Sequence, residues 1–575
     1  GRGLLAAFLV VVTLAAYWGN QQLGHDAGSI ARRGRPTAAE RTYDEIKAEF
    51  DTSADNCYLL VDLPAANSDA HLFTPTAIAA IRKLVVTLET QASVADIIWL
   101  DQVVSLIADG VQPLLPPAGA SVEEFAEARR RASVHPLVAG QLLSTGEREM
   151  LLVVLFDPVA VAGRRHEAVD EVAAIARQTS DTTPLRVRIT GNTPLTIEAG
   201  RIAARENDRY MMIGPILAFV MAAWLFRGAA AVVIVSMAPL LGVYWTTGAM
   251  GLWGEKINPL NAATLPVLTM MIGFTDAIHL MIFIRRQRHH GQGQLDAAKS
   301  AIARVGLACF LTSITTAVGF LSLTIAEAVI VQRFGWVCAL GVCLTFLAVI
   351  VLVPLLSTTW IARRIDRGYG RDIVHRNLHR FEFFIDAVIR RATPLSAIGI
   401  ALTIALAASV FWLKPDSRLI DDFPATSEPA QTLVDVDRHF GGILTINATV
   451  DWPEGDTLAT PEVIDALAEV DAILGGARDV RYPISVLNLL ELAPPDASLA
   501  TRVALLNFAP PELLRSMVRP DLRRALVTAR VQDKGYAYYQ PIYADIRAQL
   551  DELAARYPGF QFRLTGRPLV RGRVF

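Results

Sequence analysis

The strongest constraint on this chain is a set of seven apolar stretches, each about as long as a helix that crosses a lipid bilayer. Such a helix needs about 20 mainly apolar residues. Six of the stretches contain no charged residue, and the fourth contains Asp276 and His279. The stretches are Gly3 to Gln22, Tyr210–Phe226, Gly228–Gly254, Ile257–Ile284, Val305–Ala326, Phe334–Ala362 and Ala392–Leu413. The sequence therefore predicts a polytopic α-helical membrane protein.

The composition agrees with this prediction. Hydrophobic residues make up 52% of the chain and charged residues 19%, whereas soluble domains carry about a quarter charged residues. The net charge of −2 argues against a nucleic-acid binder. The four cysteines show neither a disulfide framework nor a zinc-ligand spacing. Because the chain starts at Gly1 with an apolar run, we expect that the natural protein begins upstream. A cleaved signal peptide is the alternative for this run, which lacks a small-residue cleavage site.

Positive charge predicts the orientation in the membrane, because short cytoplasmic links are rich in lysine and arginine. The link between the fourth and fifth stretches is basic, and eight arginines lie between Arg363 and Arg391. We therefore expect a cytoplasmic N-terminus, with the stretches 23–208 and 414–575 outside. Phe381, Phe384, Ile385 and Val388 are spaced as the apolar face of an amphipathic helix on the inner surface or against protein.

The two long outer stretches share four short matches in the same order, which predicts an internal duplication. Short β-like and helical runs alternate within each copy, as in α+β domains. The matched pairs are Phe50 with Phe440, Val61–Pro64 with Val450–Pro453, Thr74-Pro75 with Thr460-Pro461, and Arg188–Gly191 with Arg563–Gly566. By symmetry we expect five further spans, about 160 residues, after the second copy.

The predicted layout has six parts. They are a first helix over 1–22, a first outer α+β domain over 23–208, helices two to six over 209–362, a basic amphipathic cytoplasmic linker over 363–391, a seventh helix over 392–413 and a second outer α+β domain over 414–575.

Asp276 and His279 form the centre of the candidate site. An ionisable side chain in hydrocarbon costs at least roughly 2.5–3.5 kcal/mol on insertion scales, so Asp276 needs a reason to lie there. His279 follows three residues later, on the same face of a helix. A carboxyl group in a low dielectric favours its neutral form, so it can take up a proton on one side and release it on the other. The alternative is a structural hydrogen bond between helices.

Hydroxyl groups extend this predicted proton relay. They come from Thr275 beside the aspartate and from Thr312, Thr315 and Thr316, a polar stripe in the fifth stretch that also contains Ser313. The alternative for each hydroxyl is a bond to a carbonyl of its own helix.

Other chemistry finds little support in the sequence. The chain contains no Gly-Lys dipeptide and hence no Walker-type phosphate loop. The ten histidines form no metal-ligand cluster, and no nucleophile–base motif stands out. We therefore expect no catalytic residues, no cofactor and no metal.

The runs Ile272–His279 and Leu311–Leu323 resemble the fourth and fifth spans of the resistance–nodulation–division (RND) superfamily. The second run is similar to that of its lipid-handling branches, which include the mycobacterial large membrane proteins, hopanoid and sterol transporters, and Patched. The resemblance implies proton-driven export through the porter domains and a proton-relay role for Asp276. Relatives often carry a second acid where this chain has Thr275, and they place partner residues in a tenth span.

The sequence thus favours a secondary active transporter of a hydrophobic or amphipathic molecule, with a lipid preferred, in a bacterial inner membrane. One alternative is a sterol-sensing or receptor-like protein that binds lipid without pumping it. Another is an auxiliary subunit of protein secretion. The substrate-binding residues, the oligomeric state and a periplasmic partner protein are left open.

Overall fold

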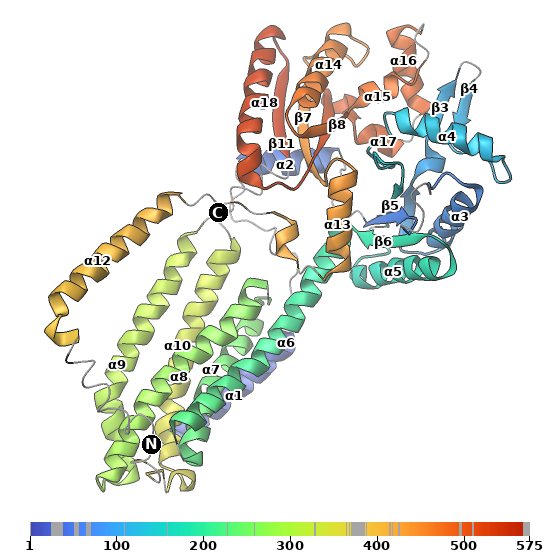
Figure 1. Ribbon diagram of the computed structural model, residues 1–575. Coiled ribbons are helices and arrows are strands. Elements are labelled where there is room, and N and C mark those ends of the chain that lie inside the picture. The colour runs from blue at the N-terminus through green and yellow to red at the C-terminus, as the bar shows by residue number, and fades with distance from the viewer. Residues whose placement is uncertain are drawn as a thin grey trace. The chain divides into compact units, whose positions relative to one another are not determined.

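The computed structural model resolves two compact units, each described here by itself. The helical unit contains residues 1–35 and 199–413, and the sheet unit contains residues 36–198 and 414–575 (Figure 1). The described residues are 2–24, 38–50, 57–64, 71–107, 110–157, 159–226, 228–257, 259–326, 329–363, 365–366, 369, 386, 388–412, 416, 418–423, 426–493, 497–508 and 511–566.

Long apolar helices make up the helical unit. They are α1 (Arg2–Gln22), α6 (Asn192–Leu225, which starts in the sheet unit), α7 (Ala229–Leu252), α8 (Pro259–His289), α9 (Gln294–Ser322), α10 (Val329–Ser357) and α12 (Ala392–Ser409). Six helices in the described part of the chain are long and apolar enough to cross a membrane, and they coincide with the second to seventh predicted stretches. The first predicted stretch forms α1. The amphipathic helix predicted at Phe381–Ile385 lies outside the described residues.

Small residues allow α7 to contact its neighbours closely. A Cβ atom on Gly248 would lie 2.4 Å from the Cα atom of Ala16 in α1, and one on Gly242 would lie 2.6 Å from the Cα atom of Thr345 in α10. The indole of Trp245 donates a hydrogen bond to Thr13 in α1 at 3.1 Å. Such close contacts matter in a bilayer, where lipid tails are as apolar as the helices and packing drives helix association.

Gly248→Ala should destabilise the helical unit by roughly 1–3 kcal/mol, because the added methyl group meets the backbone of α1. Gly399→Ala in α12 is the matched control, since nothing lies within 4 Å of a Cβ atom there. The control should be neutral or slightly stabilising. Thermal unfolding of the purified proteins tests this, and equal midpoints for the two variants would contradict the packing argument.

The sheet unit contains two sheets with the same arrangement of strands. The first sheet has the order β2-β5-β1-β6 and the second β11-β7-β10-β8, with β9 paired to β10. Read from opposite edges, β5 corresponds to β10 and β1 to β7. The strands are β1 (Cys57–Asp62), β2 (Val94–Ile98), β5 (Glu149–Phe156), β6 (Arg186–Thr190), β7 (Leu444–Asp451), β8 (Val480–Ile484), β9 (Val518–Arg519), β10 (Arg524–Val531) and β11 (Gln561–Gly566), and β3 (Val104–Ile107) pairs with β4 (Gly110–Pro113).

Helices cover both faces of each sheet. α3 and α5 pack on the first sheet around one apolar core, and α14 and α18 pack on the second around another. The helices of this unit are α2 (Ala38–Glu49), α3 (Pro75–Glu89), α4 (Val122–Val134), α5 (Arg165–Thr182), α13 (Glu428–His439), α14 (Pro461–Gly476), α15 (Val486–Leu490), α16 (Leu499–Leu505), α17 (Pro511–Arg515) and α18 (Tyr536–Arg556).

The second face of each sheet is covered by a helix from the other half of the chain. Ile46 of α2 and the adjacent Phe50 contact Leu526 of β10, while Val436 of α13 and the adjacent Phe440 contact the first sheet. The two outer stretches, predicted as separate domains, therefore share one compact unit. Its boundaries in the chain, 35/36 and 198/199, differ from the predicted 22/23 and 208/209 because α6 is continuous across the second one.

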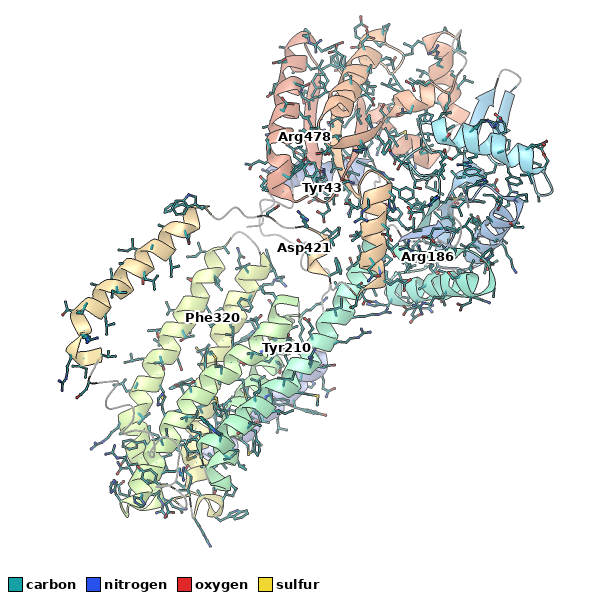
Figure 2. All side chains as sticks on the ribbon, in the orientation of Figure 1. Tyr43, Arg186, Tyr210, Phe320, Asp421 and Arg478 are labelled. Atoms are coloured by element: carbon teal, nitrogen blue, oxygen red, sulfur yellow. The ribbon has the colours of Figure 1, made fainter. Side chains whose placement is uncertain are left out.

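Similar ion pairs occur at both places where a helix from one half of the chain covers the sheet of the other half, which we call the helix exchanges. Asp62 of β1 accepts hydrogen bonds from Arg186 (labelled in Figure 2) and Arg188 of β6, and Arg188 also pairs with Asp435 of α13. In the second half, Asp451 of β7 pairs with Arg524 at 2.7 Å and Arg563 at 3.2 Å, and Arg563 reaches Glu45 of α2 at 3.6 Å. The strand order and the ion pairs thus recur in the two halves of the sheet unit, and the duplication stays a prediction.

Asp437, near the end of α13, is predicted to make the stability of the sheet unit depend on pH. Burial raises the pKa of this carboxyl group to about 6, although it accepts hydrogen bonds from the backbone N–H groups of Ile443 and Asp533. The unfolded chain loses this proton near pH 4, so the folded state binds more protons between about pH 4 and 6. Stability should therefore fall as the pH rises through this window and stay low above it.

Asp437→Asn should remove this dependence and stabilise the protein at pH 7 by roughly 1–3 kcal/mol, because the amide oxygen still accepts both hydrogen bonds. Thermal midpoints at pH 5 and pH 7 provide the measurement. An identical change between the two pH values in wild type and variant would show that Asp437 is not responsible.

Candidate functional site

The candidate site lies where α8 and α9 contact each other. Asp276 of α8 is 5% exposed. The hydroxyl of Ser313 in α9 donates a hydrogen bond to Asp276 Oδ2 at 3.1 Å. The thiol of Cys309, one turn earlier in α9, also forms a hydrogen bond with this carboxyl group. The structure thus brings together one buried carboxyl group and two small polar side chains.

Local packing explains why α8 can bury Asp276. Gly273 lies one turn before it, and a Cβ atom there would lie 2.3 Å from the Cγ2 atom of Thr345 in α10. On the facing helix, the buried face of α9 consists of small residues, including Cys309, Ser313 and Ala317, at intervals of four. This spacing is typical of closely packed membrane helices. The carboxyl group therefore lies in a tight contact between helices.

The other predicted site residues lie differently. Thr275 and His279 are exposed on α8, although His279 is near enough to Asp276 to attract its carboxylate electrostatically. Each predicted hydroxyl donates to a carbonyl of its own helix. The bonds are Thr275 to Met271 at 3.0 Å, Thr312 to Cys309 at 2.9 Å, Thr315 to Leu311 at 2.9 Å and Thr316 to Thr312 at 2.7 Å.

Ser313 is the polar partner that the sequence analysis passed over in favour of the threonine stripe. The interval of four small residues from Cys309 to Ala317 was the signal that could have identified it. Arg285 lies directly after the fourth stretch, where the sequence predicts a basic link. Its side chain is fully buried within α8, donates from Nε to the Ile365 carbonyl at 2.9 Å and lies 5.5 Å from the ring centre of Phe226.

An apolar cleft of about 470 Å³ lies on the same helical unit. Met211 and Pro215 of α6, Met237 and Leu240 of α7, and Met270 of α8 contribute to its lining. Clefts of this size and character hold ligands that are largely apolar. Among the residues that the structure describes, no group of three or more His, Cys, Asp or Glu side chains could hold a metal ion.

Comparisons with known proteins agree with this architecture. The MMPL family matches residues 37–393, more than half of the chain, in accord with the resemblance of the fourth and fifth stretches. A membrane protein of Methanocaldococcus jannaschii is 29% identical over 189 residues, which cover 32% of this chain and 48% of that protein. The membrane protein ActII-3 of Streptomyces coelicolor is 26% identical over 251 residues, 39% of this chain and 34% of that protein. The chain thus spans half or less of the curated relatives it matches.

Proposed function

The chain belongs to the MMPL family of membrane transporters, and on that premise we propose that it exports a hydrophobic or amphipathic molecule, with a lipid preferred, driven by a proton gradient. The observation that carries the proposal is the burial of Asp276 at the contact between α8 and α9. The proposed setting is a bacterial inner membrane, with a cytoplasmic N-terminus and a periplasmic sheet unit.

The proposed coupling follows from charge burial. Ionised Asp276 relies on the hydroxyl of Ser313 and the thiol of Cys309 to offset the loss of water. Protonation removes the charge, so the two states favour different packing of α8 against α9. A change in protonation can thereby shift the population of two helix arrangements, as alternating access requires. Exposed His279 would contribute to proton exchange near this site.

The apolar cleft supports a substrate with hydrocarbon chains. Its named lining side chains are aliphatic, proline and thioether groups from three helices. Such a surface offers contact to an acyl chain but few hydrogen bonds to a polar solute. The same cleft would also suit the alternative of a lipid-binding receptor, which predicts that dissipating the proton gradient leaves the ligand distribution unchanged. Nothing specific favours a secretion subunit.

Asp276→Asn should lower gradient-driven transport by roughly a hundredfold or more, the scale on which losing a proton-transferring side chain acts. The amide can still accept the bond from Ser313, so membrane insertion and thermal stability should be retained. The measurement is transport by the full-length protein in liposomes with an imposed pH gradient. Asp296→Asn, at the exposed start of α9, is the control. Transport at the wild-type rate in Asp276→Asn would refute the relay.

Ser313→Ala should slow the same transport roughly tenfold or more, because it removes one hydrogen bond to the charged carboxylate, a loss of about 1.5–3 kcal/mol. Thr315→Val removes a hydroxyl that is bonded to its own helix and should change the rate less than twofold. Rates at several pH values distinguish this role from a loss of folded protein. Equal effects of the two variants would mean that Ser313 has no special place in the relay.

A further inference from the structure

Arg530 of β10 lies on the face of the second sheet that is opposite its apolar core. In β10, Ala529 and Val531 belong to that core, whereas Leu526 contacts Ile46 and Phe50 on the other face. Because side chains alternate along a strand, Arg530 lies on the same face as Leu526. Its side chain is half-buried. A charge in this position requires compensation.

Among the described residues, the strand neighbours of Arg530 carry no negative charge. Thr445 of β7 and Arg481 of β8 are its partners in the adjacent strands, so a second arginine occupies the facing ladder position. Burial lowers the pKa of the Arg530 guanidinium, and the Tyr58 and Tyr482 hydroxyls act against this shift. Within the described ranges, no carboxylate forms an ion pair with Arg530. Two facing arginines without an acid are unfavourable unless an anion joins them.

Asn447 supplies an independent sign of a missing ligand. It is 5% exposed and lies on the same face, paired with Thr528 of β10, diagonally next to Arg530. Its Oδ1 atom is buried and has no hydrogen-bond partner among the described residues. Buried polar atoms are nearly always hydrogen-bonded in folded proteins. A ligand that carries both an anionic group and a hydroxyl would satisfy the arginines and this amide.

The first sheet shows that the fold does not require these polar groups. Glu149 in β5 and Arg524 in β10 are aligned with Asp62 and Asp451, the equivalent aspartates of the neighbouring strands. Glu149 and Arg524 are therefore equivalent positions. Leu155 lies six residues after Glu149, as Arg530 lies six residues after Arg524, so Leu155 is the equivalent of Arg530. Val153 likewise takes the place of Thr528, and Tyr58 that of Asn447. The same architecture is therefore built with apolar and aromatic residues in one half and with a polar group in the other.

We propose that Arg530, Arg481 and Asn447 bind the anionic group of an amphiphile, a phosphate or a carboxylate that also carries a hydroxyl. Arg481 is exposed, so the group can enter from solvent on that side. Guanidinium groups suit this task because they bind phosphate and carboxylate oxygens through paired hydrogen bonds. The inference rests on the proposed function in one respect, that the amphiphile is the transported molecule. It specifies the substrate class as anionic.

The test compares two probes that differ by one phosphate group, lysophosphatidic acid and the monoacylglycerol with the same acyl chain. Binding to the full-length protein in a non-ionic detergent is measured by titration calorimetry. We expect the phosphate probe to bind at least roughly tenfold more tightly, with Arg530→Leu removing most of this preference and Arg530→Lys keeping part of it. Arg530→Leu should fold, because Leu155 takes the equivalent place, and its thermal midpoint checks this.

Two controls make the outcome specific. Arg130→Gln removes an exposed arginine of the same unit and should keep the full preference. Asp276→Asn should keep the preference for the phosphate probe over the monoacylglycerol, whatever its transport rate, so a failure of proton coupling is separable from a failure of this site. The proposal is overturned if the wild type shows no preference, if folded Arg530→Leu retains it, or if inorganic phosphate alone binds as tightly as the amphiphile, which would indicate a site for a free anion.

Discussion

The close approach of α7, α8 and α10 is the constraint on which the helical unit depends. Gly242 of α7 and Gly273 of α8 both lie against Thr345 of α10, where any larger residue would overlap it. In a bilayer the hydrophobic effect does little to join apolar helices, so contacts at this distance supply the binding energy between them. They also fix the rotation of α8 about its axis. That rotation buries Asp276 and leaves Thr275 and His279 exposed.

The packing of these helices limits how much of the site the sequence alone could predict. A lone acid in an apolar stretch of membrane length is conspicuous, so Asp276 was found from composition alone. Its partner was not, because hydroxyl groups are common in membrane helices and most satisfy themselves on their own carbonyl groups. Only the rotation of α9 distinguishes Ser313 from Thr312 and Thr315, and that rotation depends on which small residues face α8. A membrane-spanning segment can be recognised from consecutive residues, whereas the residues that contact one another between two helices cannot.

The sheet unit shows a similar limit. The matched segments Val61–Pro64 and Val450–Pro453 overlap the last residues of β1 and β7, which are equivalent strands of the two sheets. The exchange of α2 and α13 was invisible, because each helix has an ordinary amphipathic pattern that does not say which sheet it covers. Both predicted domains lie in one compact unit. Which sheet each of these helices covers follows from contacts between distant parts of the chain, and those contacts are known only once the strand register of both sheets is known.

The arginines at the helix exchange give a standard against which Arg530 can be judged. Arg188, Arg524 and Arg563 each contact a carboxylate of the neighbouring strand. At one equivalent position the strand residue is acidic in the first sheet and basic in the second, and each has an opposite partner on the covering helix. Glu149 of β5 contacts His439 of α13, and Arg524 of β10 contacts Glu49 near the end of α2. The fold therefore tolerates exchange of residue types but keeps opposite charges together. Among the described residues, Arg530 is paired with no carboxylate, at a position where the first sheet has Leu155, and the proposed anionic ligand would supply the missing negative charge.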